Sequence, residues 1–66
     1  MLTVEMARLA KETRADVIVP DGTTGVVVRH DDQFAEVHTH QGGEMYPLAD
    51  LEPSQTLLEA ADESGQ

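Results

Sequence analysis

The sequence contains no cysteine and no tryptophan, and Phe34 and Tyr46 are its only aromatic residues. Without cysteine, neither a disulfide framework nor a thiolate metal site can stabilise the fold. A domain of about 66 residues buries only about 60% of the surface that its unfolded chain exposes. We therefore expect a thin hydrophobic core, which must be supported by flanking helices, by a partner chain, or by a metal site built from imidazole and carboxylate groups.

Positive charge is also scarce, because four Lys and Arg residues stand against 13 Asp and Glu residues, for a formal net charge of -9. Most of the basic residues lie before residue 16, so the rest of the chain is almost wholly acidic. An acidic chain repels phosphate backbones and anionic lipids, which argues against nucleic acid and membranes as partners. The acid excess is typical either of a surface that promotes solubility or of a protein from a cell with a salt-rich interior.

Long apolar runs are missing as well. No segment approaches the roughly 20 apolar residues of a membrane span. The first ten residues lack the basic region, the apolar region and the cleavage site of a signal peptide. These absences predict a cytoplasmic protein with a single domain over residues 1–66.

Residues 3–14 have the periodicity of an amphipathic helix. Glu5, Arg8 and Glu12 share one face, and Thr3 is placed to act as the N-cap. Because a helix of this length is marginal in water, its apolar side must dock on the sheet or on a second copy of the chain.

The C-terminal residues 54–66 predict a short helix with a frayed tail. Thr56 and Glu59 have the spacing of a capping box, and Leu57, Leu58 and Ala61 could form one or two helical turns.

Between these ends, residues 16–53 alternate short Val-rich segments with turn sequences. This spacing is typical of a small antiparallel β-barrel. A four-residue loop over 30–33 would pair Val28 with Ala35, and a two-residue turn at Gly42-Gly43 would pair Val37 with Leu48. A three-residue loop, which would pair Val28 with Glu36, conflicts with burial. The residues expected in the core are Val17, Val19, Val26, Val28, Val37, Tyr46, Leu48 and Leu51.

The segments Gly25-Val26-Val27-Val28, Phe34-Ala35-Glu36-Val37 and Asp50-Leu51-Glu52-Pro53, together with the glycine pair, resemble the SH3-like barrels of small bacterial and archaeal proteins. These include KOW-type modules and accessory subunits of metalloenzymes. The resemblance covers residues 16–53 and is one of architecture. It implies a mainly β fold, with five antiparallel strands closed into a small barrel. KOW-type modules contact RNA through basic loops, whereas the loops here are acidic. Peptide-binding SH3 domains use an aromatic groove that this chain lacks.

Glu36, His38 and His40 are expected on one face of the third strand. Imidazole and carboxylate groups are ligands suited to zinc or another divalent metal, although further ligands must come from elsewhere in the chain. A row of solvated polar side chains is the simpler interpretation. No nucleophile with a base and an orienting acid can be proposed from the spacing, so we expect no enzyme and no cofactor.

The predicted register places Ile18, Val27, Phe34 and Met45 on the outer face of the sheet. An exposed apolar patch marks protein contacts, unless the first helix covers it. The sequence therefore predicts a non-catalytic protein-interaction module that acts as a small subunit, an adaptor or a self-associating dimer. The alternative is a metal-linked accessory or sensor protein that uses the Glu36 face. A KOW-type nucleic-acid-associated module is the third candidate function.

Overall fold

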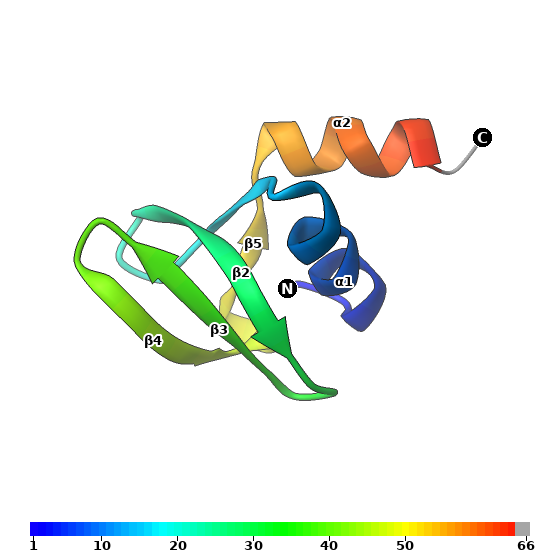
Figure 1. Ribbon diagram of the computed structural model, residues 1–66. Helices are drawn as coiled ribbons and strands as arrows, with labels where there is room; N and C mark the ends of the chain where they lie inside the picture. The colour runs from blue at the N-terminus through cyan, green and yellow to red at the C-terminus, as the bar shows by residue number, and fades with distance from the viewer. Residues whose placement is uncertain (65–66) are drawn as a thin grey trace.

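The computed structural model describes residues 1–64 as two helices packed beside a five-stranded antiparallel sheet (Figure 1). Fraying was predicted over residues 63–66, but Glu63 and Ser64 belong to the last helix of the chain, and Gly65 and Gln66 lie outside the described residues. Neither helix of the described part is long and apolar enough to cross a membrane. The elements in chain order are α1 (Val4–Thr13), β1 (Asp16–Ile18), β2 (Thr24–His30), β3 (Phe34–Thr39), β4 (Gly42–Pro47), the 3-10 helix η1 (Leu48–Asp50), β5 (Glu52–Pro53) and α2 (Gln55–Ser64).

Helix α1 confirms the first predicted helix and its cap. The Thr3 side chain accepts a hydrogen bond from the backbone N–H of Met6 at 3.1 Å, which satisfies one of the free donors of the first turn. The helix ends at Arg14, which adopts the left-handed conformation with φ 59°. Glycine usually occupies this position because its missing Cβ removes the steric penalty.

The strands form a sheet in the order β4-β3-β2-β1-β5, and every neighbouring pair is antiparallel. Five antiparallel strands are therefore confirmed. The two helices contain 10 residues each, so the predicted mainly β character holds only in part. Within residues 1–64, β4 and β5 form the two edges of the sheet.

Strand β2 contains a bulge that the sequence analysis did not anticipate. Val27 pairs with Val37, but the next pair is Arg29 with Glu36, so Val28 is the extra residue. Val27 is 1% exposed, whereas Val28 is 41% exposed. The predictions that Val28 lies in the core and that Val27 faces outward are therefore wrong.

On the N-terminal side of the bulge, the register is the one that the sequence analysis rejected. Val26 lies opposite His38, as a three-residue loop would require. Val26 is consequently half-buried on the outer face and is not a core residue. A three-residue loop was expected to conflict with burial, because it would pair Val28 with Glu36. The bulge leaves Val28 unpaired and shifts the pairing by one residue before the strands reach the loop, so Arg29 pairs with Glu36 instead.

The hairpin between β3 and β4 turns at residues 40–41 and not at the glycine pair. Val37 therefore lies opposite Glu44, and the predicted pairing with Leu48 is wrong. Gly42 follows the turn with φ 113°, a conformation that favours glycine. The glycine pair shapes the first residues of β4 and does not form the turn itself.

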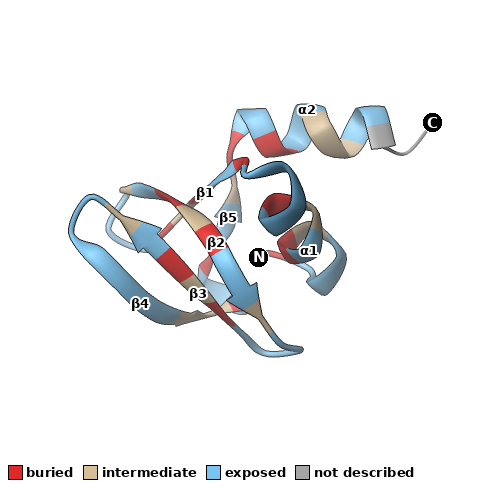
Figure 2. Cartoon of the chain, viewed as in Figure 1, coloured by how far each residue is buried: buried red, intermediate tan, exposed pale blue. Residues whose placement is uncertain are grey.

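The core lies between α1, the inner face of the sheet and the start of α2 (Figure 2). Small residues of α1 allow the helix to approach the sheet closely, with Met6, Leu9 and Tyr46 packed at the margin. Tyr46 is half-buried, so its predicted core position is wrong. The buried hydrophobic residues are Leu2, Ala7, Ala10, Ala15, Val17, Val19, Val27, Ala35, Val37, Leu48, Leu51 and Leu57.

Helix α2 is longer than the one or two turns predicted, and a different residue caps it. The Ser54 hydroxyl accepts a hydrogen bond from the Leu57 N–H at 3.2 Å and donates one to the Asp16 carbonyl at 2.5 Å. Ser54 therefore begins the helix and also holds it to β1. The predicted capping box at Thr56 and Glu59 is wrong.

Candidate functional site

The outer face of the sheet, which lies opposite the core, presents side chains of β3 and β4. Phe34 lies opposite Pro47, and Glu36 lies opposite Met45. Phe34 and Met45 are therefore diagonal neighbours, close enough for long side chains to meet. Phe34 is 41% exposed and Met45 is 50% exposed. We call Phe34, Met45 and Pro47 the outer apolar patch.

Only part of the predicted contact surface lies in this patch. Phe34 and Met45 are exposed as expected, and Ile18 is half-buried on β1. Val27 is buried in the core and cannot contact a partner unless the fold opens. The bulge at Val28 explains the difference, because it places Val27 on the inner face.

A line of charged groups borders the outer apolar patch. Arg29 Nε donates to Glu36 Oε1 at 2.6 Å, and His38 Nε2 lies 2.7 Å from Glu36 Oε2. The hydrogen bond from His38, followed by the one from Arg29, holds the pKa of Glu36 below its ordinary value. Glu36 is thus kept ionised and is held between two basic side chains.

The His38 imidazole packs over Gly43 on the neighbouring strand. A Cβ added at Gly43 would meet the imidazole ring, so this position is kept free for the side chain of His38. The glycine therefore helps to direct His38 along the sheet surface toward Glu36.

The three predicted metal ligands do not converge. Glu36 and His38 interact with each other, but His40 lies in the turn between β3 and β4. His40 is close enough to Asp21 to contribute to lowering its pKa, although the larger cause is a hydrogen bond from the Thr23 N–H. Among residues 1–64, no group of three or more His, Asp and Glu residues is arranged to hold a metal ion.

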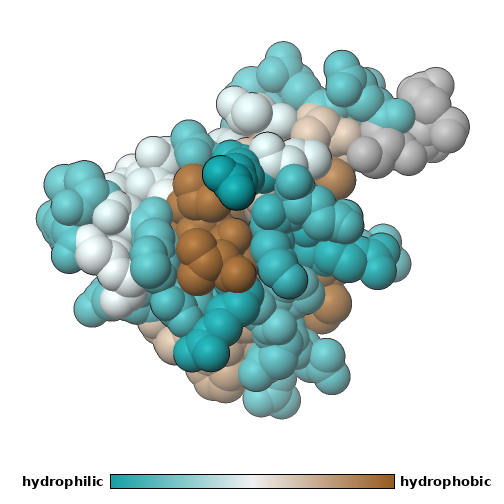
Figure 3. Space-filling model, viewed as in Figure 1, coloured by the Kyte–Doolittle hydropathy of each residue, from teal (hydrophilic) through white to brown (hydrophobic). Residues whose placement is uncertain are grey.

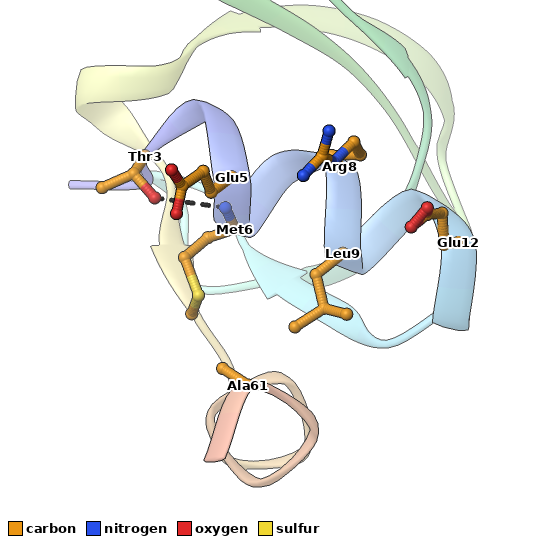
Figure 4. Close-up of a pocket in the computed structure, with 7 residues that line it drawn as sticks. All are labelled: Thr3, Glu5, Met6, Arg8, Leu9, Glu12 and Ala61. Atoms are coloured by element: carbon orange, nitrogen blue, oxygen red, sulfur yellow. Dashed lines mark hydrogen bonds between the residues drawn. The ribbon is translucent and has the colours of Figure 1, made fainter. Parts of the chain in front are cut away.

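Helices α1 and α2 border a hollow of about 410 Å³ (Figure 4). Met6 and Leu9 project from α1 toward α2, where Ala61 faces them. Glu5 and Glu12 lie along the exposed side of α1. The apolar side of α1 thus docks on the sheet and on α2 of the same chain, and it is only partly open to a partner.

A second hollow, of about 540 Å³, lies between the end of α1 and β2. Lys11 and Arg14 line it together with Val26, Val27 and Val28. This combination of residues was not predicted from the sequence. The clustering of basic residues before residue 16 was visible, but only the bulge reveals that Val28 accompanies them on the surface.

In comparisons with known proteins, no family model matches the chain, and no curated protein or solved structure matches it either.

Proposed function

We propose that this protein is a non-catalytic protein-interaction module that binds another polypeptide through the outer apolar patch. The observation that carries the proposal is the exposure of Phe34 and Met45 as diagonal neighbours on the outer face. Aromatic residues, methionine and arginine are enriched at protein interfaces, and Arg29 lies next to the patch. Exposed apolar side chains that adjoin one another mark contact surfaces.

The polar residues of the described chain support a non-catalytic role. Among residues 1–63, Ser54 is the buried polar residue, and its hydroxyl is engaged in capping α2. The Glu36 carboxylate is likewise engaged by Arg29 and His38 on an open surface. Catalytic groups usually occupy a sheltered pocket in which burial tunes their protonation, whereas Glu36 lies on the outer face of the sheet.

We also propose that the sheet corresponds to an SH3-like small barrel. The return of β5 to pair with β1 and the 3-10 helix directly before β5 support this architecture. In such a barrel, the outer apolar patch lies on the surface of the β3–β4 hairpin, where a partner could reach it.

The proposal is tested with a photo-crosslinking residue placed at Met45 in the cells that make the protein. A matched probe at Glu12 on α1, which is also exposed, measures random contacts. We expect the probe at Met45 to crosslink one or a few proteins, and Phe34→Ser to weaken that capture by about thirtyfold or more, because truncating an interface hot spot costs about 2 kcal/mol or more.

Equal crosslinking from the two positions, or capture that persists unchanged in Phe34→Ser, would remove the outer apolar patch from consideration. Circular dichroism of Phe34→Ser serves as the folding control, since Phe34 lies outside the core cluster.

A further inference from the structure

Basic side chains are rare in this chain, yet two of the four line one apolar hollow. Lys11 and Arg14 lie beside Val26 and Val28 between α1 and β2. Figure 3 shows hydrophobic atoms gathered over the middle of β2, with strongly hydrophilic residues above and below them. Within residues 1–64, neither Lys11 nor Arg14 forms an ion pair. We call this surface the basic hollow.

Arg14 stands at a position where the backbone favours glycine. Its φ of 59° lies in the left-handed region, which costs energy for a residue with a Cβ. Strain of this kind is often retained where the side chain has a function. A side chain at this position borders the basic hollow, which glycine could not do.

Helix α2 carries the complementary features. Leu58 is 46% exposed, and Glu59 and Glu63 are exposed one turn apart. Every charged residue of α2 is acidic. Because like charges four residues apart destabilise an isolated helix, α2 gains stability from any contact that supplies positive charge.

The position of α2 leaves these residues accessible. The helix extends beyond the rest of the fold (Figure 1), and most of its length is exposed (Figure 2). Its contacts within the chain involve α1, β1 and β5, with Leu57 as its buried anchor. At 10 residues it is shorter than the roughly 12–15 residues at which isolated helices become stable in water.

We propose that two copies of the chain associate by docking α2 of each copy on the basic hollow of the other. Leu58 covers the exposed valines, while Glu59 and Glu63 face Lys11 and Arg14. Each copy provides one helix and one hollow, so a reciprocal pair closes with two-fold symmetry. At physiological salt, repulsion between the acidic copies is screened beyond about 8 Å, whereas charge pairs in contact are screened less.

The proposal is tested by analytical ultracentrifugation of the full chain over a concentration series in about 150 mM salt. Two charge-reversed variants are compared with the wild type: Lys11→Glu/Arg14→Glu and Glu59→Lys/Glu63→Lys. We expect the wild type to dimerise and each variant to remain monomeric, since like charges then face each other. An equimolar mixture of the variants should form a heterodimer, because every contact again joins opposite charges.

Two controls separate this contact from other causes. Glu5→Lys/Asp32→Lys changes the net charge as much as Glu59→Lys/Glu63→Lys, at exposed acids outside the proposed contact, and should dimerise like the wild type. Phe34→Ser/Met45→Ser should also dimerise, which separates this inference from the proposed function. Circular dichroism verifies that each variant is folded.

Three results would overturn the proposal: a monomeric wild type, reversed variants that dimerise like the wild type, or a mixture of the variants that fails to associate. If the wild type is monomeric, the basic hollow remains available to bind an acidic segment of another protein.

Discussion

Val27 and Val28 carry the same side chain, yet the bulge in β2 places one in the core and the other at the surface. Val27 packs within a core cluster that also contains Val37, whereas Val28 lies outside that cluster and is exposed at the basic hollow. Because the core is thin, each buried methyl group contributes a large fraction of the total stability. The bulge thus decides which of the two valines stabilises the fold.

This assignment predicts different costs for the same substitution at neighbouring positions. We expect Val27→Ala to lower the free energy of unfolding by about 1–3 kcal/mol, because it removes buried methyl groups and leaves a cavity. Val28→Ala should change the free energy of unfolding by less than about 0.5 kcal/mol. Urea denaturation midpoints measure both, and equal losses would contradict the bulge.

Asp31 is the residue that organises the turn between β2 and β3. Its Oδ1 accepts hydrogen bonds from the N–H groups of Gln33 and Phe34, each at 2.8 Å. These bonds hold the pKa of Asp31 below its ordinary value of 3.8. The ionised carboxylate therefore stabilises the fold above that pH, and the contribution is lost as the pH falls through the lower pKa of the folded state.

We expect Asp31→Asn to be less stable than the wild type at neutral pH, with a difference that fades as the pH falls below about 3.8. Asp32→Asn removes the same charge from the neighbouring residue of the turn and is the matched control. Thermal unfolding of the three proteins between pH 7 and pH 2 measures the effect. A difference between Asp31→Asn and the wild type that stays constant across this range would contradict the role of the carboxylate.

Among the elements, α1 was the most predictable. Its cap and periodicity are encoded within a few neighbouring residues, and the helix appears where the sequence placed it. The existence of the β-strands was equally accessible, because turn sequences interrupt the Val-rich segments. The register of the strands could not be predicted from the sequence, since a bulge or a displaced turn changes the pairing without leaving a periodic signal.

The outer apolar patch shows the same division between local and tertiary information. Phe34 lies on β3, whose burial alternates along the strand, and the displaced turn moves the partner of Val37 from Leu48 to Glu44, an even shift that leaves Met45 on the same face. Val27 was misplaced by the bulge. The basic hollow is lined by residues from the end of α1 and from β2, which are separated in the sequence, so no local pattern could reveal it.

Helix α2 depends on Ser54 at its start. We expect Ser54→Ala to cost about 0.5–2 kcal/mol, since it removes the cap of the Leu57 N–H and the bond to Asp16. Thr56→Ala, at the cap that the sequence had suggested, should cost less than about 0.5 kcal/mol. Hydrogen exchange of the α2 amides would report the loss directly, and equal protection in the two variants would contradict this capping arrangement.

Across the whole molecule, the charged residues are unevenly distributed, as are the exposed apolar residues. The first residues of the chain hold most of its positive charge, and they form α1 beside an acidic sheet and an acidic α2. This arrangement attracts α1 to the acidic sheet and to α2, and it leaves the exterior strongly negative. The outer apolar patch lies on β3 and β4, whereas the basic hollow lies between α1 and β2, so the two proposed contacts share no residue.

Strand β4 forms one edge of the sheet, and edges of this kind invite uncontrolled strand addition between molecules. Two residues of β4 counteract it. Pro47 has no backbone N–H to donate, and Glu44 places a charge on the edge, where a second identical strand would bring its own. Both residues therefore disfavour amyloid-like addition of a second β4 strand, which lowers the tendency of the protein to aggregate when it is concentrated.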